Sequence, residues 1–145
     1  MKPKRDAERI VVGVNGSSAS RAAARWAIYH ARSGDTVELI HAWSPAASVS
    51  PSGGIPDYLR EAELVTRHEL EHLRSLPRDD GVGLIGRAIR GLVVDVLSTL
   101  GADVIVIGTD SPVVHGRANM ASVPARLVRM SRKPVVVVPF VGTLA

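Results

Sequence analysis

The chain has 145 residues, of which 46% are hydrophobic and 22% are charged, so it can bury a hydrophobic core without disulfides or a structural metal. It has no cysteine, which excludes disulfides, thiolate metal sites and cysteine nucleophiles. The net charge of +4 is uneven, because no acidic residue follows Asp110 while five Arg and Lys residues do, and this asymmetry leaves open either an anionic ligand or a solvated helix face.

Short apolar runs alternate with helical patterns along the chain. We expect strands at 10–14, 37–40, about 82–89, 104–107 and 135–138. Between them we expect helices at 18–32, 57–76, 92–100 and 122–130, so that strands and helices alternate along the chain. Apolar strands separated by helices favour an α/β fold with a parallel sheet covered on both faces. We expect one domain over residues 1–145. The third strand is a candidate edge strand, because Gly83, Gly86 and Arg87 interrupt its apolar pattern.

Local signals predict where the helices begin and end. Ser17 or Ser18 can cap the first helix, Gly34 is expected to end it, and Ser122 can cap the last. The segment 44–56 holds four serines, three prolines and two glycines, which predicts a loop, either a lid or a solvated connection. No run approaches the ~18 apolar residues of a membrane helix. The charged N-terminus is not typical of a signal peptide, so we expect a cytoplasmic location without membrane association.

Four segments together resemble the universal stress protein family: residues 10–27 (IVVGVNGSSASRAAARWA), 37–43 (VELIHAW), 102–109 (ADVIVIGT) and 133–139 (KPVVVVP). The resemblance covers essentially the whole chain. It implies a flavodoxin-like three-layer sandwich with four helices and strand order 3-2-1-4-5, and a homodimer paired through the last strand. The pairing residues would be Val135, Val136, Val137 and Val138, and a physical motive supports it, because an open valine edge invites aggregation.

In such sheets ligands bind where the strand order reverses, at the loops after the first and fourth strands. ATP-binding members of the family carry G-x-x-G, nine residues, then G-[S/T] after the fourth strand. This chain keeps the spacing, from Gly108 to Ser122, but has Ser111 and Ala121 in place of two glycines. Asn15 replaces the family's acidic residue at the end of the first strand. The resemblance therefore implies a degenerate adenine-nucleotide site.

The candidate nucleotide-binding residues share these strand ends and the loop and helix start that follow the fourth strand. They are Gly13, Val14, Asn15, Ala42, Ile107, Gly108, Ser111, Ala121, Ser122 and Val123, with His115 and Arg117 as phosphate contacts. No protein metal site is expected, and Asp110 would hold Mg²⁺ only together with ATP. The alternative is a nucleotide-independent dimer that acts through unknown protein partners and keeps a vestigial site. No catalytic residue is assigned, and at most slow ATP hydrolysis is expected. Few aromatics are available to stack bases, so a nucleic-acid partner is not expected.

One motif points elsewhere: His68-Glu69-Leu70-Glu71-His72 reads as H-E-x-x-H, the zinc-peptidase pattern. No third ligand follows, since Arg78 stands at the metzincin position and no glutamate occurs after Glu71. The helix's apolar stripe is expected to comprise Leu59, Ala62, Leu70, Leu73 and Leu76. Both histidines should then face solvent, and we expect no zinc peptidase. For His41, at the end of the second strand, a satisfied hydrogen bond is the favoured interpretation.

Overall fold

The computed structural model describes residues 6–45, 55–110 and 123–140. In order, the elements are β1 (Arg9–Gly13), α1 (Ser18–His30), β2 (Thr36–Trp43), α2 (Ile55–Arg74), β3 (Gly83–Arg90), α3 (Val93–Thr99), β4 (Val104–Thr109), α4 (Val123–Met130) and β5 (Val135–Pro139). The strands pair in parallel in the order β3-β2-β1-β4-β5. The predicted α/β class, flavodoxin-like strand order and four helices are confirmed.

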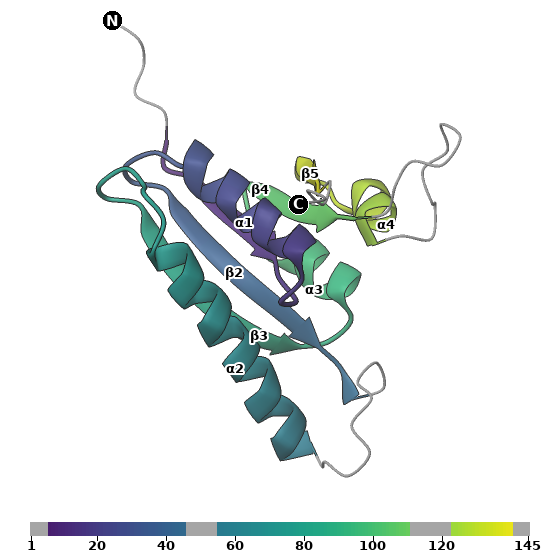
Figure 1. The fold of residues 1–145 in the computed structure, drawn as a ribbon. Coiled ribbons are helices and arrows are strands. Elements are labelled where there is room, and N and C mark those ends of the chain that lie inside the picture. Colours follow the sequence, from purple (N-terminus) through teal and green to yellow (C-terminus); the bar gives the residue numbers. More distant parts are fainter. Residues whose placement is uncertain (1–5, 46–54, 111–122, 141–145) are drawn as a thin grey trace, which may run out of the picture.

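The helices form two layers, one on each face of the sheet (Figure 1). Alternate residues of the central strands point to opposite faces, so Val12 packs in the core under α1 and α2, whereas Val11 packs in the core against α3 and α4. The first core is lined by alanines of α1, among them Ala23 and Ala27, which let the helix approach the sheet closely. The second contains Leu97 of α3, which is fully buried.

The two edges of the sheet are the predicted ones. β3 lies at one edge, and its alternating half-buried and exposed residues explain the weak apolar signal in the sequence. β5 lies at the other edge, where Val137 is 38% exposed. The valine run 135–138 therefore does form an edge strand.

The first helix ends earlier than Gly34, which corrects one prediction. α1 ends at His30, and Ala31 is already extended with ψ 145°. The cause is Asp35, which is 2% exposed and whose carboxylate accepts hydrogen bonds from the backbone N–H groups of Arg32 and Glu8, both at 2.9 Å. Gly34 instead has φ +96° within the connection to β2. At the other end, Ser17 caps α1 as expected, with its Oγ accepting from the N–H of Ser20 at 3.1 Å.

The apolar stripe predicted for α2 is correct from Ala62 onward and wrong in the first turns of the helix. Ala62 and Leu73 are buried, but Leu59 is 39% exposed. The first turns of α2 extend past the ends of β2 and β3, so no strand lies beneath them (Figure 1). α2 also begins at Ile55, two residues earlier than predicted. Most of the predicted loop, residues 46–54, and the predicted cap Ser122 lie outside the described residues.

None of the helices in the described ranges combines the length and the apolar content that crossing a lipid bilayer requires.

Candidate functional site

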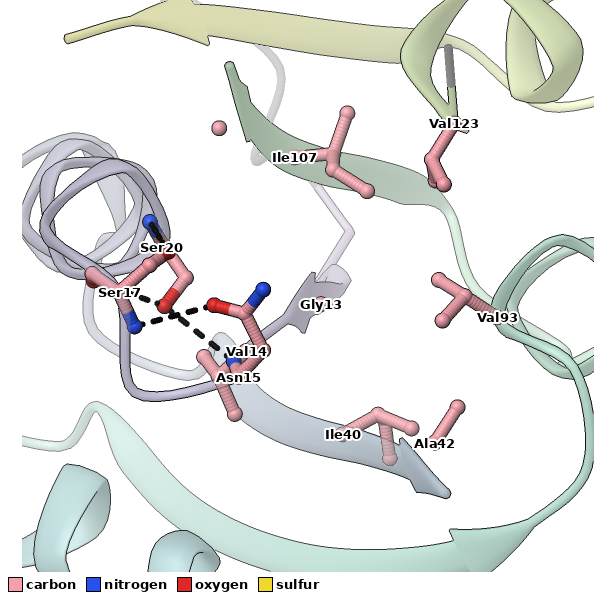
Figure 2. Close-up of a pocket in the computed structure, with 11 residues that line it drawn as sticks. Gly13, Val14, Asn15, Ser17, Ser20, Ile40, Ala42, Val93, Ile107 and Val123 are labelled. Carbon is pink, nitrogen blue, oxygen red and sulfur yellow. Dashed lines mark hydrogen bonds between the residues drawn. The ribbon is translucent and has the colours of Figure 1, made fainter. Parts of the chain in front are cut away.

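A pocket of about 130 Å³ lies at the carboxyl ends of β1, β2 and β4, where the strand order reverses (Figure 2). In parallel sheets this is the place where side chains and helix N-termini from different crossovers converge. Seven of the residues proposed from the sequence line the pocket. They are Gly13, Val14, Asn15, Ala42, Ile107, Gly108 and Val123.

Four lining residues were not predicted: Ser17, Ser20, Ile40 and Val93. Ile40 could have been found by strand periodicity, since it lies two residues before Ala42 and so shares its face of β2. Ser20 could have been found by helical spacing from Ser17. Val93 has no comparable signal, because it reaches the pocket only through the crossover from β3 to α3.

The rest of the proposed site lies between β4 and α4. Five of its residues are outside the described ranges: Ser111, His115, Arg117, Ala121 and Ser122. The glycine pattern from Gly108 to Ser122 is therefore described only at its beginning. Asp110, the candidate Mg²⁺ ligand, is described and is exposed just after β4.

Gly108 has a structural reason of its own to be a glycine. A Cβ at this position would overlap the backbone carbonyl oxygen of Ala19 and would lie 3.1 Å from the backbone nitrogen of Ser20. The end of β4 therefore packs against the first turn of α1 with no room for a side chain. This close approach brings the pocket's two halves together.

The polar side of the pocket is a small network at the start of α1. The Oδ1 of Asn15 accepts from the backbone N–H of Ser17 at 3.0 Å, and the backbone N–H of Asn15 lies 3.3 Å from the Oγ of Ser20. Gly16, between them, has φ +82°, as the turn requires. Asn15, Gly16 and Ser17 therefore form a turn that positions three polar groups beside apolar walls (Figure 2).

No lining residue in the described part of the pocket is charged. The nearest histidine along β2, His41, lies on the opposite face from Ala42, and its Nδ1 is 2.8 Å from the carbonyl oxygen of Val14. The satisfied hydrogen bond expected for His41 is confirmed. The described lining residues supply apolar contact and neutral hydrogen bonding, and none of them is an Asp, Glu, His or Lys that could act as a general base.

The H-E-x-x-H segment is part of the packing between α1 and α2. Glu69, which would be the catalytic glutamate, is 2% exposed, and its Oε1 lies 3.1 Å from the Nε of Arg21 on α1. His68 is exposed as expected, but His72 is half-buried, which corrects the prediction that both face solvent. The cause is the orientation of α2, whose inward face carries the buried Glu69 and Leu73, so that the neighbouring His72 is partly covered. Among the described residues no group of three or more His, Asp or Glu side chains could hold a metal ion.

A charged cluster lies elsewhere on the sheet, nearer the amino ends of the strands. Glu38 on β2 is 4% exposed and accepts hydrogen bonds from Arg9 of β1 at 2.7 Å and Arg87 of β3 at 2.6 Å. This three-strand bridge was not predicted. The only sequence signal was a lone glutamate inside an apolar strand.

Comparison with known proteins agrees with this architecture. The model of the universal stress protein family matches residues 7–139. A universal stress protein solved in complex with cAMP superposes with TM-score 0.67 at 22% identity, covering 93% of this chain and 98% of that one. A family protein from Arabidopsis thaliana with AMP bound gives TM-score 0.64 at 17% identity, covering 94% of each chain.

A protein of the same family from Burkholderia pseudomallei gives TM-score 0.62 at 21% identity, covering 95% of this chain and 100% of that one. No curated protein sequence matches the chain. At these identities the structures support the fold, and the family model supports membership over most of the chain. The chain belongs to the universal stress protein family.

Proposed function

We propose that this protein is a stress-response regulator that binds an adenine nucleotide in the pocket at the ends of β1 and β4. The observation that carries the proposal is that one pocket brings together residues at the carboxyl ends of both strands, with Asn15 just after β1 and Gly108 near the end of β4. Two proteins of similar fold were solved with cAMP and with AMP, which supports an adenine nucleotide as the ligand.

The pocket's composition fits a nucleobase better than a bare phosphate. Its walls include the side chains of Val14, Ile40, Ala42 and Ile107, which offer apolar contact to a flat ring. Its polar groups are neutral and gathered on one side. A base would therefore lie between the walls, with one edge toward the start of α1.

Three residues of the sequence after β4 and before α4 imply weak binding. Ser111 and Ala121 stand where ATP-binding relatives carry glycine, and a Cβ hinders the close approach of backbone N–H groups to phosphates. Asp110 adds a negative charge near the expected phosphate position, so Mg²⁺ would bind there only together with the nucleotide. We expect tighter binding of monophosphates than of ATP.

Thermal unfolding in the presence of nucleotide tests the proposal. A ligand at 100 times its Kd stabilises the native state by about 2.7 kcal/mol, which raises the unfolding midpoint by several degrees. We expect AMP or cAMP at millimolar concentration to raise the midpoint. If ATP, ADP, AMP and cAMP all leave it unchanged, the pocket is not an adenine-nucleotide site.

The second candidate function is a nucleotide-independent homodimer that acts through protein partners. The observation that favours it is that β5 is an edge strand of the described sheet, where Val137 is 38% exposed, and that Val128 and Met130 on α4 are exposed as well. Partner capture with and without ATP separates the two functions. Capture that ignores nucleotide favours the second, and capture that depends on nucleotide favours the first.

A further inference from the structure

The start of α1 forms the polar side of the pocket and is one hydrogen-bonded unit (Figure 2). The backbone carbonyl of Ser17 accepts the N–H of Arg21 at 3.0 Å and the hydroxyl of Ser20 at 3.1 Å. The hydroxyl oxygen of Ser20 in turn lies 3.3 Å from the backbone N–H of Asn15. A rotation of this first turn about the helix axis would therefore move all the polar groups on this side of the pocket.

Packing against the sheet specifies the rotation of this turn only weakly. The residues that the first half of α1 buries are all small: Ala19, Ser20, Ala23 and Ala24. Large side chains that pack in this core, those of Trp26 and Ile28, come in the second half. The close contact between Gly108 and Ala19 fixes how far the turn lies from β4. Small side chains form shallow ridges, however, so they do little to set the rotation of the helix end.

A directional contact from α2 holds the same turn. Glu69, in the H-E-x-x-H segment, is 2% exposed, and its Oε1 lies 3.1 Å from the Nε of Arg21. Arg21 is two residues after Ala19, so the contacts with α2 and with β4 lie on roughly opposite sides of α1. Because a buried carboxylate is strongly destabilising without its partner, Glu69 keeps the side chain of Arg21 at one point of the interface. The first turn of α1 is therefore held from both sides.

We propose that Glu69 positions the polar side of the pocket through Arg21, so that the buried carboxylate of the H-E-x-x-H segment contributes to ligand affinity. The inference rests on the proposed function, because it concerns ligand binding in the same pocket. Neither residue is among the described lining residues, so both are positioning residues. With the ion pair in place, the polar groups at the start of α1 are held in one arrangement before the ligand binds, which lowers the entropic cost of binding.

The test removes the ion pair in the variant Arg21→Met/Glu69→Met. Replacing a buried ion pair by apolar side chains of similar size is often neutral for stability, so the fold should be retained. The matched control is Arg67→Met/Glu71→Met, which makes the same two replacements at exposed positions of α2 outside the described lining of the pocket. Calorimetric titration of AMP measures the Kd of wild type and both variants, and thermal unfolding measures their stability. Amide hydrogen exchange of Ser20 reports how firmly the turn is held.

We expect Arg21→Met/Glu69→Met to unfold within a few degrees of wild type, but to bind AMP about fivefold or more weakly and to exchange the N–H of Ser20 faster. The control variant should match wild type in all three measurements. If wild type binds AMP and Arg21→Met/Glu69→Met binds it equally well, the inference is wrong and the nucleotide site stands. If AMP binds none of the three proteins, both the inference and the proposed function fail.

Where the double variant does not fold, Glu69→Gln decides. It keeps the shape of the side chain and an acceptor for Arg21, but the hydrogen bond loses the charge of the carboxylate. We expect a smaller weakening of AMP binding, about twofold to threefold, and none for the control Glu71→Gln. Equal Kd values for these two variants would overturn the inference.

Discussion

The side chains at the carboxyl ends of the strands differ in charge from those nearer the amino ends. At the carboxyl ends, Asn15, Gly108 and their neighbours form a neutral pocket. Nearer the amino ends, Glu38 is buried between Arg9 and Arg87 and ties three strands together. The described lining of the pocket is uncharged, whereas a buried carboxylate joins three strands nearer their amino ends. Substitutions at the two places should therefore separate stability from ligand binding.

The largest expected effect is that of Gly108→Ala, which tests whether this glycine joins the two halves of the pocket. Its Cβ would overlap the carbonyl oxygen of Ala19, so β4 or α1 must shift, and we expect a loss of about 3 kcal/mol or failure to fold. The control is Gly101→Ala, whose Cβ would meet only Arg9 Nη1, at 3.6 Å. Urea unfolding measures both. Equal stability of the two variants would show that the end of β4 does not depend on this contact.

The next effect is that of Glu38→Gln, which keeps the shape of the side chain but removes its charge. Arg9 and Arg87 are 33% and 47% exposed, so water screens part of the interaction, and we expect a loss of about 1–2 kcal/mol. Glu71→Gln, at an exposed position of α2, should change stability by no more than about 0.5 kcal/mol. Chemical denaturation checks the pair, and nucleotide affinity should stay the same in both. A change in affinity for Glu38→Gln would show that the two regions are coupled.

A smaller loss is expected for Ser17→Ala at the pocket itself. Removing this cap leaves the N–H of Ser20 without its acceptor, which should lower the free energy of unfolding by about 1 kcal/mol. Ser98→Ala, which removes a long 3.3 Å hydrogen bond on α3, is the control and should change stability less. Thermal unfolding measures both variants. A destabilisation by Ser98→Ala as large as that by Ser17→Ala would contradict the capping role.

The sequence predicted the sheet well because its signals are local. Uninterrupted runs such as 104–107 read as buried strands, and the broken pattern around Gly86 read as an edge. The errors come from contacts between distant segments. Asp35 accepts the N–H of the distant Glu8, and the buried Glu69 pairs with Arg21 in the interface between two helices. Neither partner is visible from spacing along the chain.

The candidate site was predictable where it follows strand ends and unpredictable where crossovers bring residues in. Asn15 and Ala42 lie close to the carboxyl ends of β1 and β2 and were predicted, whereas Val93 follows the crossover from β3 and was missed. The role of Gly108 was only half anticipated. The family pattern explains this glycine by phosphate binding, but the structure adds its close packing against Ala19.

The central claim is that the pocket between β1 and β4 binds a nucleotide. Its most direct test is calorimetric titration of AMP into wild type, Ala42→Phe and Ala88→Phe. Ala42 lines the pocket, whereas Ala88, also half-buried, lies on the neighbouring strand β3 outside it. We predict that Ala42→Phe weakens binding about tenfold or more by filling the space, while Ala88→Phe binds as wild type does. Binding of AMP that is unchanged in Ala42→Phe would place the nucleotide elsewhere and contradict the claim.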